Sequence, residues 1–169
     1  MVDDVSDLPQ LHELPERSRI VQQRLLDAGL DARVRELPAS TRTAAEAAAA
    51  LGCEVGSIAS SLVFMADGAP LLVMTSGRHR VDLDLVARHV SAASIAMATP
   101  QEVRAATRQA IGGVSPVGHP APVRTLVDEA LRDYATVWAA GGTPRTIVPL
   151  TVDQLVALTG GQELRVASD

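Results

Sequence analysis

The glycine-rich segment Ile111–His119 is the part of this sequence whose residue types and spacing are best suited to holding a ligand. It contains three glycines and a proline within eight residues. Glycine adopts backbone conformations that other residues avoid, and its missing side chain leaves neighbouring amide groups accessible. Such a loop can present N–H groups to a carbonyl or phosphate oxygen, as an oxyanion hole does. A tight connection that binds nothing would have the same spacing, so the pattern alone leaves both interpretations open.

A few polar side chains are further candidates for chemistry. His119 ends the glycine-rich segment and could serve as a base or contact a ribose, or simply hydrogen-bond within the loop. Ser60 and Ser61 would need a base and an orienting third group to act as nucleophiles, and neither is visible nearby in the sequence. Ser115 and Thr43 are suitable polar residues for lining a pocket, although Thr43 also has the position of a helix cap.

Metal chemistry has no support in the sequence. Cys53 is the only cysteine, so the chain can form no internal disulfide, and a cysteine-based zinc site is disfavoured. The four histidines show no close ligand spacing. We therefore predict no metal site.

The charge distribution limits how this protein could meet a nucleic acid. All 15 basic residues are arginine, so no side-chain ammonium is available, and the formal net charge is −5. Proteins that follow a nucleic-acid backbone over many phosphates usually carry a basic stripe. No such stripe is evident in the sequence, which favours contact with an end of a nucleic acid.

Length and composition predict one domain outside a membrane. The 169 residues are 47% hydrophobic and 21% charged, which is ordinary for a globular domain. No apolar run approaches the ~20 residues of a membrane helix, and the acidic N-terminus does not resemble a secretory signal. We expect a cytoplasmic protein with a loose arm over residues 1–15 and a single domain over residues 16–169.

Helix signals and strand signals alternate along the chain. Three capping boxes, an N-cap aspartate and one amphipathic stretch predict helices that begin at Glu16, Thr43, Asp82, Thr99 and Thr151. Runs of β-forming residues predict strands at Ala32–Leu37, Ile58–Met65, Pro70–Thr75, Ile95–Ala98, Val123–Val127, Thr136–Ala139 and Thr146–Leu150. Asp67-Gly68 predicts a hairpin between two of these strands. The predicted fold class is therefore α/β, with a mixed, mostly antiparallel central sheet and surrounding helices.

Several stretches, in order, resemble the YbaK/EbsC family of freestanding aminoacyl-tRNA deacylases, which are related to the editing domain inserted in bacterial prolyl-tRNA synthetases. The matching segments are Ser40–Ala48, Ile58–Phe64, Ser76–Leu83, Ile111–His119, Trp138–Pro144 and Leu150–Gly160. Together they cover nearly all of the chain from about Arg17 onward.

The resemblance implies a trans-acting hydrolase for the ester that joins a wrong amino acid, typically alanine or cysteine, to a tRNA. It places the loop from Gly112 to Pro116, including Gly113 and Ser115, against this ester, where backbone amides help to position water. It implies that no cofactor is needed. The partners it implies are the acceptor end of an aminoacyl-tRNA and an aminoacyl-tRNA synthetase. The substrate-binding residues it suggests are Ser60, Thr43, Arg42, Arg80, His119 and Gly141.

The sequence departs from the family pattern at the strand that has the sequence I-A-K-S-L-V-F in the family. Its lysine is the family's best-known functional residue, and this chain has Ser60 there. Arg42, Arg78 or Arg80 could supply a charge, but as a planar fork instead of a compact ammonium. Ala140 and Ile147 stand where the cysteine-specific branch has serine and aspartate.

Two alternatives to a deacylase follow from these departures. The first is a catalytically silent protein that binds aminoacyl-tRNA or an aminoacyl-like ligand. The second is an interaction domain that docks on a synthetase.

Overall fold

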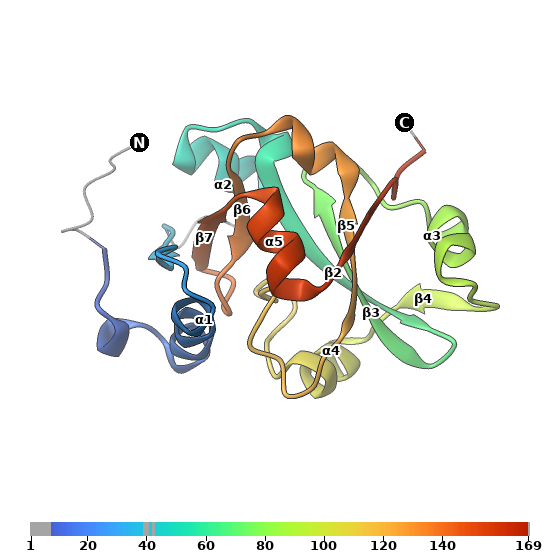
Figure 1. Ribbon diagram of the computed structural model, residues 1–169, viewed down its shortest axis with the longest axis horizontal. Coiled ribbons are helices and arrows are strands. Elements are labelled where there is room, and N and C mark those ends of the chain that lie inside the picture. Colours follow the sequence, from blue (N-terminus) through green and yellow to red (C-terminus); the bar gives the residue numbers. More distant parts are fainter. Residues whose placement is uncertain (1–7, 39–40, 42, 169) are drawn as a thin grey trace.

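The computed structural model describes residues 8–38, 41 and 43–168, and these form one sheet with helices on both faces (Figure 1). Its α-helices are α1 (Glu16–Asp27), α2 (Ala44–Leu51), α3 (Leu83–Val90), α4 (Pro100–Thr107) and α5 (Val152–Thr159). Short 3-10 helices lie at η2 (Leu11–Glu13), η3 (Val55–Ser57) and η4 (Glu129–Asp133). The strands are β1 (Arg35–Glu36), β2 (Ile58–Ala66), β3 (Ala69–Ser76), β4 (Ile95–Met97), β5 (Arg124–Asp128), β6 (Val137–Ala140), β7 (Thr146–Leu150) and β8 (Gln162–Leu164).

The predicted helix starts are confirmed, and four of the five have a side-chain cap; α1 begins after Pro15 without one. The side chains of Thr43, Asp82, Thr99 and Thr151 all accept a hydrogen bond from a backbone amide in the first turn of their helix. At Thr99 and Thr151 the reciprocal bond of the capping box is also present. Of the three predicted capping boxes, the one at Thr43 is incomplete, because the carboxylate of Glu46 accepts from the Thr43 hydroxyl and not from its amide.

The sheet is mixed, with the strand order β1-β7-β6-β2-β3-β5-β8 and with β4 paired to β2. Within the described residues, β1–β7, β2–β3, β2–β4 and β6–β7 are antiparallel, whereas β2–β6, β3–β5 and β5–β8 are parallel. The predicted fold class is confirmed. The hairpin at Asp67-Gly68 joins β2 to β3, where both residues have positive φ.

Two strands differ from the prediction. β1 is shorter than the predicted Ala32–Leu37, because the side chain of Gln22 on α1 binds the preceding segment. It donates to the carbonyl of Ala32 and accepts from the amide of Val34, so these groups bond to a helix side chain and not to a strand. β8 was not predicted, since its three residues are too few to show an alternating pattern.

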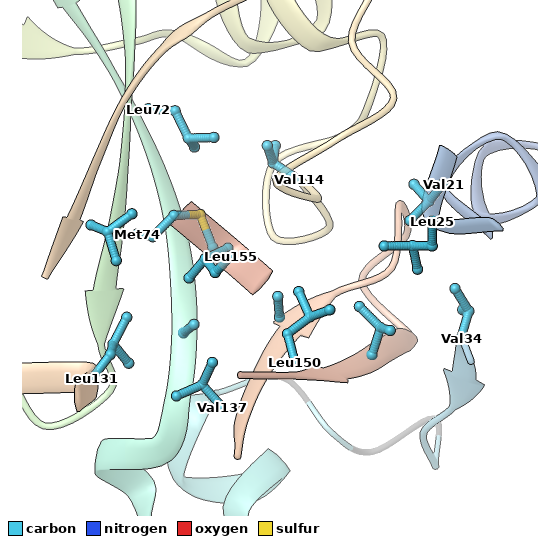
Figure 2. Close-up of a cluster of buried hydrophobic side chains, with 14 of the residues drawn as sticks. Val21, Leu25, Val34, Leu72, Met74, Val114, Leu131, Val137, Leu150 and Leu155 are labelled. Carbon is cyan, nitrogen blue, oxygen red and sulfur yellow. The ribbon is translucent and has the colours of Figure 1, made fainter. Parts of the chain in front are cut away.

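The core lies on both faces of the sheet. On one face, α1, α4 and α5 pack against side chains such as Leu72 and Met74, and Val114 of the glycine-rich segment joins this cluster (Figure 2). On the other face, α2 packs over Trp138 and its neighbours, and α3 packs over a cluster around Phe64. Alternate residues of β2 and β3 therefore serve opposite faces.

The end of the predicted arm contacts the domain. Leu14 is only 4% exposed and belongs to the main core cluster, directly before α1. The division of the chain at residue 15 stays a prediction. Across the described part of the chain, no helix combines the length and apolar character needed to cross a membrane.

Candidate active site

A gap in the pairing of β2 creates the site. β6 pairs with β2 only at Ile58 and Ala59, and β4 pairs with it only from Phe64 to Ala66. The edge of β2 between these two contacts, residues 60–63, has no neighbouring strand among the described residues. A central strand thus has an open edge in the middle of the sheet.

The main-chain groups of Ser61 face this opening. The carbonyl of Ile58 accepts from the amide of Gly77, at 2.7 Å, and therefore points toward β3. Backbone groups of successive residues in an antiparallel strand point to alternate edges, so those of Ser61 point away from β3. The carbonyl of Val63 follows the same rule, because it accepts from the amide of Ala98 on the far edge. Ser61 consequently offers both an N–H and a C=O to a ligand.

A cleft of about 310 Å³ fills this gap. One wall comes from the start of α2 and from β7, and the other comes from the glycine loop, which we define as Ile111–His119, together with Pro144. Two large apolar residues of its lining, Met97 and Ile111, are 53% and 54% exposed. The lining residues are Leu37, Thr41, Thr43, Ala44, Ala47, Ile58–Val63, Met97, Ala98, Val103, Ile111, Gly112, Val114, Trp138, Ala140, Pro144, Thr146 and Ile147.

The cleft contains no charged side chain among the described residues. Its polar groups are threonine and serine hydroxyls and the main chain. Electrostatic stabilisation of a bound group therefore comes from oriented dipoles. Such dipoles act strongly where water is excluded.

Close packing holds the glycine loop against the turn between β6 and β7. A Cβ atom on Gly113 would lie 2.4 Å from the carbonyl carbon of Thr143 and 2.5 Å from the nitrogen of Pro144. Only glycine permits this approach of two backbones. Gly112 is exposed instead, has φ +87°, and would bring a Cβ no nearer than 3.9 Å to Pro144.

A buried glutamine, which the sequence analysis did not identify, fixes the inner side of the loop. The side chain of Gln109 accepts from the amide of Ser115 at 2.6 Å and donates to the carbonyl of Val117 at 3.1 Å. The hydroxyl of Ser115 in turn accepts from the amide of Val117. Ser115 and Pro116 are buried and lie outside the lining of the cleft. No local pattern marks Gln109, because its partners are six and eight residues away.

This bonding leaves the amides of Ile111, Gly112 and Val114, the three loop residues that line the cleft, without an acceptor among the described residues. Gly113 donates to the carbonyl of Ala110, and Ser115 donates to Gln109. Of the three amides without an acceptor, those of Gly112 and Val114 alternate with these two bonded amides. The arrangement resembles an oxyanion hole formed by alternate amides.

The predicted substrate-binding residues occupy different places. Ser60 and Thr43 line the cleft, but the hydroxyl of Thr43 is occupied by the cap of α2. The hydroxyl of Ser60 makes no hydrogen bond with any described residue, so it is available. Gly141 is buried behind the cleft, where a Cβ atom would lie 2.8 Å from Val34.

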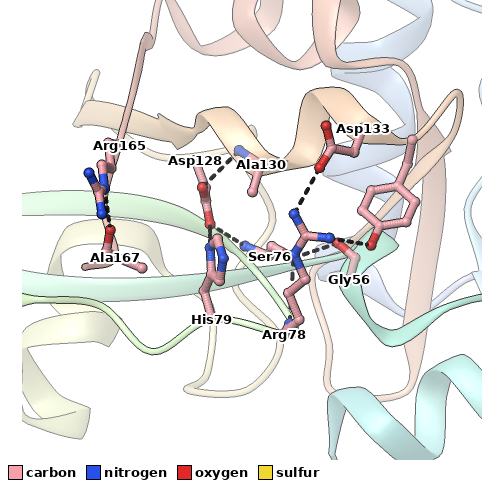
Figure 3. A network of polar contacts seen from close by, with 10 residues as sticks. Gly56, Ser76, Arg78, His79, Asp128, Ala130, Asp133, Arg165 and Ala167 are labelled. Carbon is pink, nitrogen blue, oxygen red and sulfur yellow. Dashed lines mark hydrogen bonds and ion pairs between the residues drawn. The ribbon is translucent and has the colours of Figure 1, made fainter. Parts of the chain in front are cut away.

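The arginines proposed to replace the family lysine lie elsewhere. Arg80 is exposed and does not line the cleft. Arg78 pairs with Asp133 at 2.8 Å and lies over the ring of Tyr134, in a network on the other side of β3 (Figure 3). Arg42 lies outside the described residues.

His119 borders a second cavity on the opposite side of the glycine loop. Its Nε2 lies 2.7 Å from the carbonyl oxygen of Ser115. Burial lowers the pKa of His119, and the positive charge of Arg24 lowers it further, while the hydrogen bond to Ser115 opposes both. The neutral imidazole is therefore favoured.

A separate polar network surrounds Asp128 (Figure 3). This carboxylate is 1% exposed and accepts from the amides of Ser76 and Ala130 and from Nδ1 of His79, which lies 2.8 Å away. The network ties the loop after β3 to the start of η4. Across the described residues, no group of three or more histidine, cysteine, aspartate or glutamate side chains could hold a metal ion.

Comparison with known proteins identifies the family. Residues 38–158 match the model of the aminoacyl-tRNA editing domain. The chain belongs to the aminoacyl-tRNA editing domain family. The matched range contains β2, α2, α4, the glycine loop and every described residue of the cleft except Leu37.

Individual relatives agree with this assignment. A crystal structure of a candidate trans-editing enzyme for prolyl-tRNA synthetase has 47% sequence identity and a TM-score of 0.88, over 92% of this chain and 99% of that chain. The proline–tRNA ligase of Bacillus licheniformis is 34% identical over 124 residues, which are 71% of this chain but 21% of the ligase. EbsC of Enterococcus faecalis, named as a candidate Cys-tRNA(Pro)/Cys-tRNA(Cys) deacylase, is 26% identical over 71% of this chain and 74% of that protein.

Proposed function

We propose that this protein is a trans-acting aminoacyl-tRNA deacylase that hydrolyses the ester of a mischarged tRNA in the cleft. The observation that carries the proposal is the neutral cleft at the open edge of β2, faced by the available amides of Gly112 and Val114, in a domain of the editing family. The extensive match to a candidate trans-editing enzyme supports action in trans.

The chemistry follows from these groups. Water attacks the ester carbonyl carbon, and the amides of Gly112 and Val114 stabilise the negative charge that develops on the carbonyl oxygen. The bond to the ribose oxygen then breaks, and that oxygen takes up the proton that the attacking water gives up and leaves as the hydroxyl of the terminal adenosine. The Ser61 main chain and the Ser60 hydroxyl orient the aminoacyl group and the water. Gly113, Ser115 and Pro116 act indirectly, since they hold the loop in place.

The substrate has a small amino acid at the acceptor end of the tRNA. Alanine, valine and isoleucine make up half of the residues that line the cleft of about 310 Å³, which suits a side chain such as that of alanine or cysteine. The half-exposed Met97 and Ile111 give the terminal adenosine an apolar surface to lie on. Prolyl-tRNA synthetase is the enzyme whose errors this protein corrects, because synthetases of that type carry the same domain.

A deacylation screen tests the proposal. Purified protein is incubated with Ala-, Ser-, Cys- and Pro-charged tRNA, and the release of amino acid is compared with spontaneous hydrolysis. We expect acceleration for at least one of the first three and the least for Pro-tRNA. If the protein accelerated the release of amino acid from none of the four tRNAs, the proposed deacylase activity would be overturned.

A silent aminoacyl-tRNA binder is the second candidate function. It is favoured by Ser60 in place of the family lysine and by the absence of a charged side chain from the described lining of the cleft. Such a protein would bind a non-hydrolysable aminoacyl-adenosine and yet leave all four esters intact. If the protein also failed to bind this analogue, the remaining hypothesis would be an interaction domain that docks on a synthetase.

A further inference from the structure

A second cavity carries a concentration of positive charge that the proposed chemistry does not use. It measures about 330 Å³ and lies between α1 and α4. Four arginines line it: Arg17 and Arg24 from α1, and Arg104 and Arg108 from the end of α4. We call this cavity the arginine groove; its other lining residues are Glu16, Ile20, Gln109, Gly118, His119 and Pro120.

The charge of the groove is uncompensated within the described structure. None of its four arginines forms an ion pair with a described residue, and Glu16 is the single acidic residue of its lining. In contrast, Arg78 and Arg132 on other surfaces pair with carboxylates at 2.6–2.8 Å. In a chain with a net charge of −5, four arginines with one acidic neighbour form a local site for an anion.

The backbone conformation of Arg108 also supports an anion site in this groove. It caps α4 with φ +57°, in the left-handed region where glycine is the usual residue. A large side chain is strained in this conformation. The arginine side chain is thereby directed from the end of α4 to the groove that it lines.

The groove and the cleft share two walls. α4 lines the cleft through Val103 and the groove through Arg104, which is the next residue. The glycine loop lines the cleft through Gly112 and the groove through Gly118 and His119. A molecule bound in both places would therefore cross the glycine loop.

We propose that the arginine groove binds phosphates of the tRNA backbone near the acceptor end, while the cleft holds the aminoacyl ester. The inference rests on the proposed function for the nature of the ligand. Arginine offers several N–H donors in a planar fork that matches a phosphate, so a few contacts are enough to orient the RNA. The groove is too small to follow a helix, which agrees with contact confined to a short part of the backbone.

Paired glutamine variants test the groove. Arg104→Gln and Arg108→Gln remove charge while keeping a long polar side chain, and Arg88→Gln on the distant α3 is the matched control. Affinity for uncharged tRNA is measured by fluorescence anisotropy from 50 to 300 mM salt. For the wild type we expect the logarithm of the affinity to fall with the logarithm of the salt concentration with a slope of about −2 to −4. Each groove arginine removed should make this slope shallower by about one unit and weaken binding at least about fivefold. Arg88→Gln should keep the wild-type slope.

A second readout separates the groove from the deacylase. The ratio of kcat/KM for charged full-length tRNA to that for 3′-aminoacyl-adenosine should fall about tenfold in the double variant, because the small substrate has no backbone to reach the groove. If the double variant kept the wild-type affinity and salt slope, the proposal that the groove binds tRNA phosphates would be overturned. If wild-type protein cleaves neither substrate, the proposed function fails, but the tRNA affinities still decide whether the groove binds RNA.

Discussion

Replacement of Gly113 by alanine is the most direct perturbation of the way the glycine loop is held. The new Cβ atom would lie 2.4 Å from the carbonyl carbon of Thr143 and 2.5 Å from the nitrogen of Pro144. Carbon atoms in favourable contact are about 3.5–4.0 Å apart. Both obstructing atoms are backbone, so no side-chain rotation relieves the overlap, and the loop must move away by about 1 Å.

The expected effects follow from this displacement. Overpacking of this kind costs about 1–3 kcal/mol, and the backbone contacts place Gly113→Ala toward the upper end. For a chain of this size, each kcal/mol lowers the Tm by about 2–4 °C, so a decrease of roughly 6–12 °C is expected. The amides of Gly112 and Val114 move with the loop, and a displacement of about 1 Å in a catalytic group can reduce the rate about 100-fold.

The assay combines thermal unfolding with deacylation at a temperature where the variant is fully folded. Gly160→Ala is the control, since a Cβ atom on Gly160 meets nothing within 4 Å and its cost comes from its own positive φ; Gly160 lies at the end of α5, outside the cleft. It should lower the Tm by a few degrees without changing kcat/KM. A Gly113→Ala protein with wild-type Tm and wild-type rate would refute the reasoning about the loop.

Three further substitutions probe the loop and the missing lysine. Ser60→Lys adds a charged donor to the neutral cleft, and a charge-assisted hydrogen bond of about 1.5–3 kcal/mol would raise kcat/KM about 10- to 150-fold; an unchanged rate would show that the cleft does not need it. Gln109→Leu leaves the buried amide of Ser115 and carbonyl of Val117 without partners, so the free energy of unfolding in urea should fall by about 2–5 kcal/mol, and a loss below about 1 kcal/mol would contradict the bracing role. Burial lowers the pKa of His119 in the folded protein. As the pH falls below about 6.5, the ordinary pKa of histidine, the unfolded chain therefore binds more protons than the folded protein does. The stability that this residue contributes is present above that pH and is lost as the pH falls toward the folded pKa. His119→Gln should therefore flatten the decline in Tm between about pH 7 and pH 5, and an unaltered decline would contradict this assignment.

Features with local causes could be predicted from the sequence. The capping residues Thr43, Thr99 and Thr151 bond to amides within their own first turn, so a four-residue pattern is sufficient. The hairpin at Asp67-Gly68 likewise depends on two adjacent residues with positive φ. The resemblance to the editing family came from six short segments in order, and the family match confirms it.

The form of the site could not be predicted, because it depends on contacts between distant residues. The open edge of β2 exists only because β6 and β4 stop short of each other along it. Gly113 has the same residue type as Gly112, yet the approach of Thr143 and Pro144 makes one buried and leaves the other exposed.

The arginine groove shows the same limit. Its positive charge combines two helices that lie about 80 residues apart in the chain, so no run of basic residues marks it in the sequence. The expectation that the protein lacks a long basic stripe remains compatible with this compact cluster.

An NMR titration tests most directly whether the cleft holds the aminoacyl ester. Alanine joined to adenosine through a 3′-amide cannot be hydrolysed, and it is added to ¹⁵N-labelled protein. We expect the largest shifts at the backbone amides of Gly112, Val114 and Ser61, with slower hydrogen exchange at the two loop amides. Saturable binding that leaves these three amides unchanged and shifts others instead would contradict it.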